Sequence, residues 1–86
     1  MTLQEFNLLS LEQQQNALLR SGVYLGERKD PPLRMMLYQM DGFYVEVFFL
    51  SRYNKVGWFK GFDTIDELAP YLEKINVSGL LQEVLP

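Results

Sequence analysis

The hairpin centred on Asp41-Gly42 constrains the fold of this chain more than any other feature. The dipeptide stands between two runs of strand-forming residues, LRMMLYQM (33–40) and FYVEVFFLSRY (43–53). Asp-Gly favours a type I′ turn, in which both central residues adopt positive φ, and such a turn joins two antiparallel strands. The sequence therefore predicts a two-residue turn between adjacent strands.

These two strands are apolar on both faces, whereas a strand with one wet face alternates apolar and polar residues. Counting outward from the turn pairs Met40 with Phe43 and continues to Leu33 with Leu50, and directly opposed residues share a face. The first face collects Met36, Tyr38, Met40, Phe43, Val45, Val47 and Phe49, with Arg34 as its only charge. The second face collects Leu33, Met35, Leu37, Tyr44, Phe48 and Leu50, together with Gln39 and Glu46.

The second face needs a cover. A buried side chain of this size is worth about 1.5–3 kcal/mol, so a bare face would forfeit on the order of 10 kcal/mol, as much as the whole stability of a small domain. The cover could be the apolar tail of residues 76–86, a second copy of the chain, or a different protein. We expect a homodimer, because twofold dimers are the commonest oligomers. The candidate interface or pocket residues are Met35, Leu37, Tyr44, Glu46, Phe48, Leu50 and Trp58.

The flanking segments predict helices. Thr2 with Glu5 and Ser10 with Gln13 fit capping boxes, which predict a helical turn near 3–9 and a helix over 11–21. Gly22 stands where a left-handed residue ends a helix. Beyond the strands, DTIDELAPYLEKI (63–75) reads as a helix with an apolar stripe of Ile65, Leu68, Leu72 and Ile75. Thr64 and Glu67 fit a third capping box in that helix, and Pro70 should kink or divide it.

Two further strands complete the fold. VYLGERK (23–29) and VGWFKGF (56–62) have strand composition, and Asp30-Pro31-Pro32 forms a loop after the first of them. We predict one α+β domain spanning 1–86, with a four-stranded antiparallel β-meander between an N-terminal and a C-terminal helix. If those two helices sit on opposite faces of the sheet, the monomer covers both faces without a partner. The spacing of the residues is compatible with this alternative.

Composition excludes several classes of function. The chain has no Cys and no His, which removes disulfides, His/Cys zinc sites and the serine and cysteine triads. Residues 63–86 hold one Lys and five Asp/Glu, and this acidic third argues against a general nucleic-acid binder. We find no signal peptide and no run of about 20 apolar residues, so we expect a cytoplasmic protein without a membrane partner.

Three local patterns suggest chemistry, each with a structural alternative. A buried Glu46 could act as an acid or base, or it could pair with Arg52, Lys60 or Arg34. The cluster Asp63, Asp66 and Glu67 could hold Mg²⁺, although helix capping accounts for all three residues. Trp58 and its basic neighbours could stack single-stranded bases, but packing in a core or interface explains Trp58 better. The basic residues around the first strand, Arg28 among them, read as a solvated face. We therefore expect no enzyme, metal or cofactor.

The segments LSLEQQ, LLRSGVYLGERK, MLYQMDGFYVEVFF and DELAPYL together resemble a small group of uncharacterised bacterial proteins of similar length. The resemblance covers most of the chain, and its motifs are caps, a hairpin and apolar strands. It implies a shared fold and no particular activity. Three functions stay open: a homodimeric interaction module, a ligand-binding or sensor domain with a pocket lined by Met35, Met36 and Met40, and a hydrolase that uses carboxylates.

Overall fold

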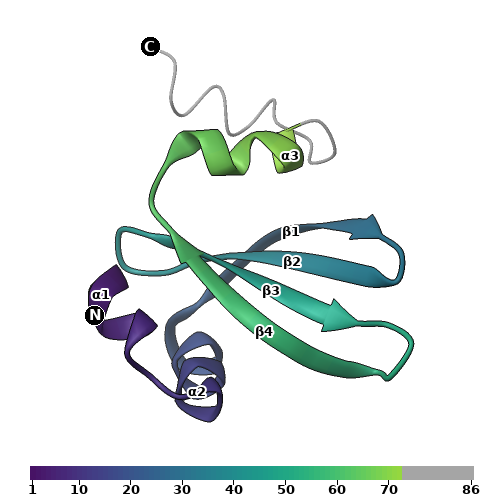
Figure 1. Cartoon of the computed structure of the whole chain (residues 1–86). Helices are drawn as coiled ribbons and strands as arrows, with labels where there is room; N and C mark the ends of the chain where they lie inside the picture. The colour runs from purple at the N-terminus through teal and green to yellow at the C-terminus, as the bar shows by residue number, and fades with distance from the viewer. Residues whose placement is uncertain (73–86) are drawn as a thin grey trace.

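The structure, a computed structural model, describes residues 1–72 and has the predicted α+β architecture (Figure 1). In chain order the elements are α1 (Leu3–Asn7), α2 (Leu11–Ser21), β1 (Val23–Asp30), β2 (Leu33–Gln39), β3 (Tyr44–Leu50), β4 (Lys55–Phe62), the 3₁₀ helix η1 (Ile65–Leu68) and α3 (Ala69–Leu72). The tail of residues 76–86, considered above as a cover, lies outside the described residues.

The four strands form one antiparallel meander in the order β1-β2-β3-β4, as predicted. The register between β2 and β3 runs from Leu33–Leu50 to Gln39–Tyr44 and matches the register counted from the turn. The expected type I′ turn is wrong in detail, because only Gly42 has a positive φ, of 82°. A left-handed conformation costs Asp41 energy that it does not cost glycine. One positive φ is enough to keep the register.

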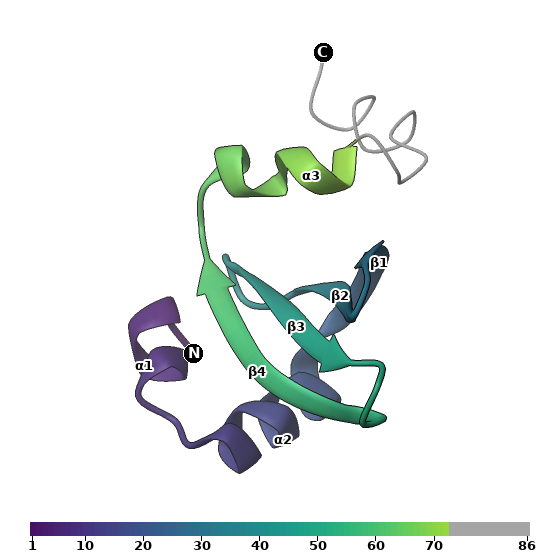
Figure 2. The ribbon, with the colours of Figure 1, turned by 45° about the vertical axis from the view of Figure 1, so that its right-hand side comes forward.

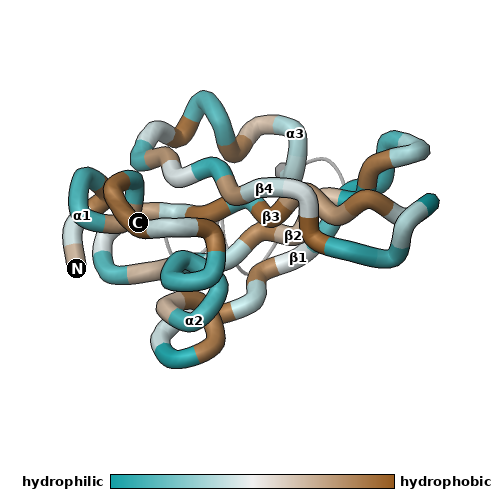
Figure 3. Tube along the Cα trace, turned by 60° about the horizontal axis from the view of Figure 1, so that its bottom comes forward, coloured by the Kyte–Doolittle hydropathy of each residue, from teal (hydrophilic) through white to brown (hydrophobic). Residues whose placement is uncertain are grey.

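The N-terminal helices pack on the first face of the sheet. Both predicted capping boxes are present, and each has a reciprocal pair of bonds between side chain and backbone at 2.8–3.2 Å. Phe6 of α1 and Leu18 of α2 enter a core with Met40, Phe43, Val45 and Val47. Hydrophobic residues run along the central strands β2 and β3 (brown in Figure 3). This face is therefore closed by the chain's own N-terminal segment.

Two glycines stand where a side chain would collide with a neighbouring group. A Cβ at Gly61 would lie 2.5 Å from Leu3 Cδ1, so the missing side chain makes room on β4 for Leu3 of α1. Gly22 does not adopt the predicted left-handed conformation, because φ is −79° and the chain continues directly into β1. Its lack of a side chain serves another purpose, since a Cβ there would lie 2.7 Å from the backbone oxygen of Leu18.

The C-terminal helical segment lies on the opposite side of the sheet from α1 and α2 (Figures 1 and 2). Pro70 follows a change from 3₁₀ to α geometry at Leu68–Ala69, so the helix is divided as predicted. The third capping box is wrong, because the Thr64 hydroxyl donates to the Glu67 carboxylate and makes no bond to the backbone. Ile65 is exposed, since η1 begins at the β4 edge and only its later turn reaches over the strands.

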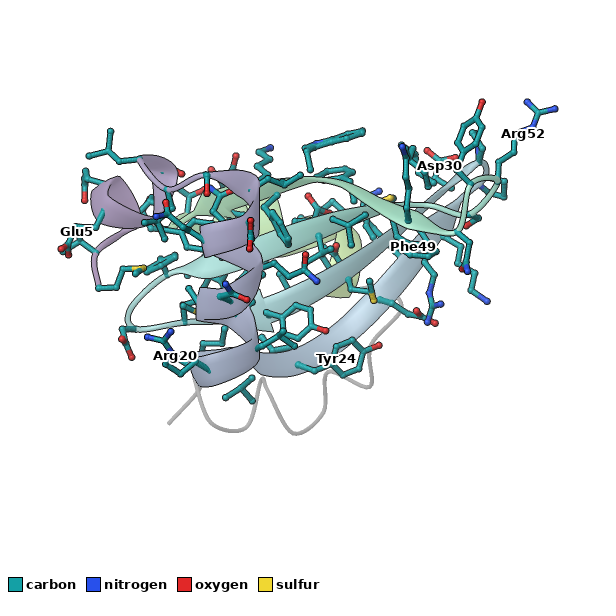
Figure 4. All side chains as sticks on the ribbon, turned by 90° about the horizontal axis from the view of Figure 1, so that it is seen from below. Glu5, Arg20, Tyr24, Asp30, Phe49 and Arg52 are labelled. Carbon is teal, nitrogen blue, oxygen red and sulfur yellow. The ribbon has the colours of Figure 1, made fainter. Side chains whose placement is uncertain are left out.

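Of the two arrangements left open above, the described residues adopt the one with helices on opposite faces. This cover of the second face is incomplete, and the far end of the sheet extends beyond α2 as well. Seen from the α2 side, Phe49, Asp30 and Arg52 lie past the helix (Figure 4). Among residues 1–72, no helix is long and apolar enough to cross a membrane.

Gly22→Ala should lower the free energy of unfolding by about 1–3 kcal/mol, because the added methyl group would overlap a backbone oxygen that cannot move alone. Ser21→Ala, at the exposed neighbouring position, is the control and should change stability by less than about 0.5 kcal/mol. Urea denaturation followed by circular dichroism measures both. Equal stability of the two variants would contradict the close packing of α2 against the start of β1.

Candidate functional site

The candidate residues all lie on the second face, where the strand register arranges them in rows across the sheet. The row nearest the Asp41-Gly42 turn contains Val23, Gln39, Tyr44 and Phe62, and the next contains Gly26, Leu37, Glu46 and Lys60. The third row contains Arg28, Met35, Phe48 and Trp58, and the last contains Asp30, Leu33, Leu50 and Lys55. The register thus brings together the seven residues proposed from the sequence.

One part of this face is covered by the C-terminal helical segment. Met35, Leu37 and Phe62 are buried beneath Tyr71 of α3, and Leu68 packs beside them. Tyr44 is half-buried and stacks on Phe62, with ring centroids 5.7 Å apart. These residues form a small core of their own, separate from the core under α1 and α2.

Glu46 lies at the centre of the covered part and is buried, with 5% of its surface exposed. Its Oε2 atom accepts a hydrogen bond from Arg28 Nη2 at 3.1 Å and another from the Tyr71 hydroxyl at 2.5 Å. The donors come from β1 and α3, so a single carboxylate oxygen links three elements. A buried carboxylate requires such partners, because an unpaired one would lose its hydration without compensation.

Arg28 reaches this carboxylate from β1, across the intervening strand β2. Its guanidinium also lies over the Tyr71 ring, 5.5 Å from the centroid, which is the geometry of a cation–π contact. Arg28 Nε is buried and has no hydrogen-bond acceptor in the described part of the chain. The arginine side chain is thus used for one hydrogen bond and for packing.

Burial raises the pKa of the Tyr71 hydroxyl well above its ordinary value of 10.0, and the hydrogen bond to the Glu46 carboxylate raises it further. The positive charge of Arg28 opposes this shift but does not cancel it. The phenol is therefore held in its protonated form, in which it donates to Glu46.

The remaining apolar residues of the second face are only partly covered by the described part of the chain, and we call Leu33, Phe48, Leu50 and Trp58 the open patch. Phe48 and Trp58 stack face to face, with centroids 4.6 Å apart and ring planes inclined by 11°. Trp58 is 44% exposed, whereas Leu33, Phe48 and Leu50 are half-buried. Tyr53, in the adjoining β3–β4 turn, is also exposed. The candidate residues therefore divide into a covered group around Glu46 and a partly exposed group around Trp58.

Sequence reasoning missed two members of the covered group. The expected partners of Glu46 were wrong: Lys60 pairs with Glu67, and Arg34 pairs with Glu27. The interpretation of Arg28 as part of a solvated face was wrong as well. Counting outward from Pro31-Pro32 pairs Asp30 with Leu33 and hence Arg28 with Met35, so the signal that places Arg28 on the second face was present.

Tyr71 had no comparable signal. The predicted stripe followed a continuous α-helix, but the chain enters the segment through a 3₁₀ turn, in which the angle between successive residues differs. Leu68 of the predicted stripe packs on the second face as expected, next to the unpredicted Tyr71, whereas Ile65 is exposed. The other stripe positions, the side chain of Leu72 and all of Ile75, lie outside what the structure describes.

The other suggested chemistries find little support in the described residues. Within residues 1–72, no three acidic, His or Cys side chains gather closely enough to hold a metal ion, and Glu67 of the proposed cluster bonds to Thr64 and Lys60. A hollow of about 210 Å³ lies beside α2, and none of the three methionines of the proposed pocket lines it. Its lining residues are Met1, Leu9, Gln13, Asn16, Ala17 and Arg20.

Comparison of the chain with protein-family models, with curated proteins and with solved structures finds no match. The resemblance to small uncharacterised bacterial proteins therefore stays an expectation, and the function must be inferred from the site itself.

Arg28→Met should lower the free energy of unfolding by about 3 kcal/mol, because it leaves the buried Glu46 carboxylate without its cationic partner. Arg34→Met is the matched control: it breaks an Arg–Glu pair whose side chains are 43% and 30% exposed, and should cost less than about 1 kcal/mol. Adding Glu46→Leu to Arg28→Met should recover part of the loss. Chemical denaturation of the three variants measures these differences, and equal losses for both arginines would contradict the special role of Glu46.

The raised pKa of Tyr71 predicts a loss of stability in alkaline solution. Because the folded state holds the phenolic proton more tightly than the unfolded chain, this contribution is complete below pH 10.0 and declines as the pH rises above that value. Tyr71→Phe should remove this decline, whereas Tyr53→Phe, at an exposed position, should keep it. Denaturation between pH 8 and 11.5 (about the usable range) measures the difference. Parallel curves for wild type and Tyr71→Phe would contradict the prediction.

Proposed function

We propose that this chain is a small non-enzymatic interaction module that associates with a second copy of itself through the open patch. The observation that carries the proposal is the last row of the second face, which reads Asp30, Leu33, Leu50, Lys55 from one edge of the sheet to the other. Its two ends carry opposite charges, and its centre is apolar.

A row of this kind is complementary to itself. In a twofold dimer both copies use the same patch. A twofold axis that runs parallel to the strands, midway between Leu33 and Leu50, places the leucines of one copy on the leucines of the other. The same axis places Asp30 of one protomer opposite Lys55 of the other, at both ends of the contact. Within a single protomer these two side chains lie on opposite edge strands, about 14 Å apart across three strand spacings, and do not pair.

The aromatic residues beside this row support the same proposal. Trp58 presents nearly half of its surface to solvent although its ring is held rigid by stacking on Phe48. Exposed Tyr53 and Arg52 lie in the adjoining turn. Trp, Tyr and Arg are the residue types that contribute most to binding at protein interfaces, and a rigid ring loses little entropy on binding.

The open patch is small, which sets the expected strength of association. A standard interface buries about 800 Å² per partner, and four large side chains supply only part of that area. A weak, concentration-dependent dimer is the expected form. The buried Glu46 carboxylate, occupied by two donors, supports a structural role and not a catalytic one. The cytoplasmic location expected from the sequence belongs to this proposal.

Charge reversal tests the dimer. Asp30→Lys and Lys55→Asp should each raise the dimer Kd roughly 10- to 30-fold, because each turns two attractive exposed pairs of about 0.5 kcal/mol into two repulsive ones. The double variant Asp30→Lys with Lys55→Asp restores opposite charges and should return Kd to within about threefold of wild type. Sedimentation equilibrium over a range of protein concentrations measures all four proteins.

Lys29→Asp is the matched control, because Lys29 is exposed and pairs in register with Arg34, on the other face. Its Kd should equal that of wild type. A wild-type protein that stays monomeric up to about 1 mM would overturn the proposal. Independent losses in the two single variants without recovery in the double variant would instead overturn the twofold arrangement.

A further inference from the structure

We propose that α3, with the preceding η1, is a displaceable cover of the second face, and that self-association selects the form in which this cover has moved away. The inference rests on the proposed function and names its regulation: Tyr71 docked on Glu46 is an inhibitory contact for the dimer.

Few contacts hold the cover. Among the described residues, Leu68 and Tyr71 are the hydrophobic side chains of this segment that join the core of the second face. The segment begins with η1, a single 3₁₀ turn of 4 residues that is too short to be stable without docking, and continues into α3, which the structure describes over Ala69–Leu72. Its first turn has no side-chain bond to the backbone, since Thr64 bonds to Glu67 instead. Among the described residues, the docked Tyr71 and the neighbouring Leu68 are therefore the contacts that hold the segment on the sheet.

Removal of the cover leaves no unpaired buried charge. Glu46 and Arg28 both belong to the sheet, and they bond to each other whether or not Tyr71 is present. When α3 leaves, the carboxylate loses one donor and gains water, and Arg28 Nε, buried without an acceptor, can be hydrated as well. Hydration of this pair offsets part of the cost of undocking, which would be larger over a wholly apolar surface. A polar centre of this kind suits a contact that opens.

Removal of the cover also extends the open patch without interruption. Met35 lies in the same row as Phe48 and Trp58, and Leu37 and Phe62 lie in the rows beyond. All three newly uncovered residues are at most 3% exposed in the docked form. The apolar surface thus grows from four large side chains to seven, which approaches the area that a stable dimer buries. A second copy that binds this larger surface buries the three apolar side chains that α3 covers in the docked form.

The coupling between undocking of α3 and dimerisation predicts how far the apparent Kd of the dimer changes. If each protomer must uncover its face before association, the apparent Kd depends on the square of the undocking equilibrium constant. Tyr71→Phe removes the hydroxyl and keeps the ring, so it should raise that constant about tenfold. Hydrogen exchange of the amides of residues 65–72, measured at a concentration where the protein is monomeric, should accelerate about tenfold. The dimer Kd should fall by up to about 100-fold.

Leu68→Ala is the second variant, because it loosens the cover without touching the polar centre, and it should shift exchange and Kd in the same direction. A tether tests the opposite change. The side chains of Lys60 and Glu67 meet at 3.3 Å on the surface, and the chain has no Cys, so Lys60→Cys with Glu67→Cys provides a unique pair for a short thiol-reactive bridge. Bridged protein should dimerise at least about tenfold more weakly than the same variant without the bridge.

The outcomes separate this inference from the proposed function. A dimer that responds to the charge reversals, but whose Kd is unchanged by Tyr71→Phe, Leu68→Ala and the bridge, would overturn the cover and keep the open patch. Monomers for every protein, including Tyr71→Phe, would overturn both. Opposite shifts in Kd for the loosened and the bridged proteins, with faster exchange confined to residues 65–72, are the supporting result.

Discussion

The central hairpin is hydrophobic on both of its faces, and the rest of the molecule is arranged around the need to cover it. The sheet places Val45 and Val47 of β3 on one side and Phe48 on the other, so no rotation or change of register can expose one side to water without cost. The chain meets this need with segments from its two ends, one on each side (Figure 1). The small size of the chain limits how completely both sides can be closed.

The two covers differ in their physical character. On the first face, α1 and α2 contribute Phe6 and Leu18 to a wholly apolar core, and Gly61 leaves room for the Leu3 side chain. On the second face, the contact with α3 is organised around a carboxylate that is shared between an arginine of the sheet and a tyrosine of the helix. Apolar packing favours permanent closure, whereas a hydrogen-bonded pair requires a specific geometry and can be rehydrated. This difference is the basis for assigning a structural role to one face and an interactive role to the other.

Much of the fold was predictable because it depends on local signals. Capping residues, the Asp-Gly dipeptide and the proline pair mark the ends of elements, and the period of two in strands then assigns each residue to a face. The same counting, applied from Pro31-Pro32, would have placed Arg28 correctly. The candidate site was less predictable: Glu46 was a candidate residue whose burial the sequence did not decide, and its partner Tyr71 lies 25 residues away across a 3₁₀ turn. Helix α2 likewise packs through Ala17 and Leu18, whereas its other leucines, Leu11 and Leu19, are exposed.

The sequence by itself determined the order of elements, the register of the central hairpin, the two-sided hydrophobicity of the sheet and the absence of His and Cys chemistry. These properties follow from residue types and from spacing along the chain, which local stereochemistry converts directly into structure. Only the tertiary structure decided which helix covers which face, which cation pairs with Glu46, and where apolar surface stays open. Those outcomes depend on the direction in which the chain leaves β4 and on contacts between residues far apart in sequence. A local sequence pattern encodes neither the direction nor the contacts.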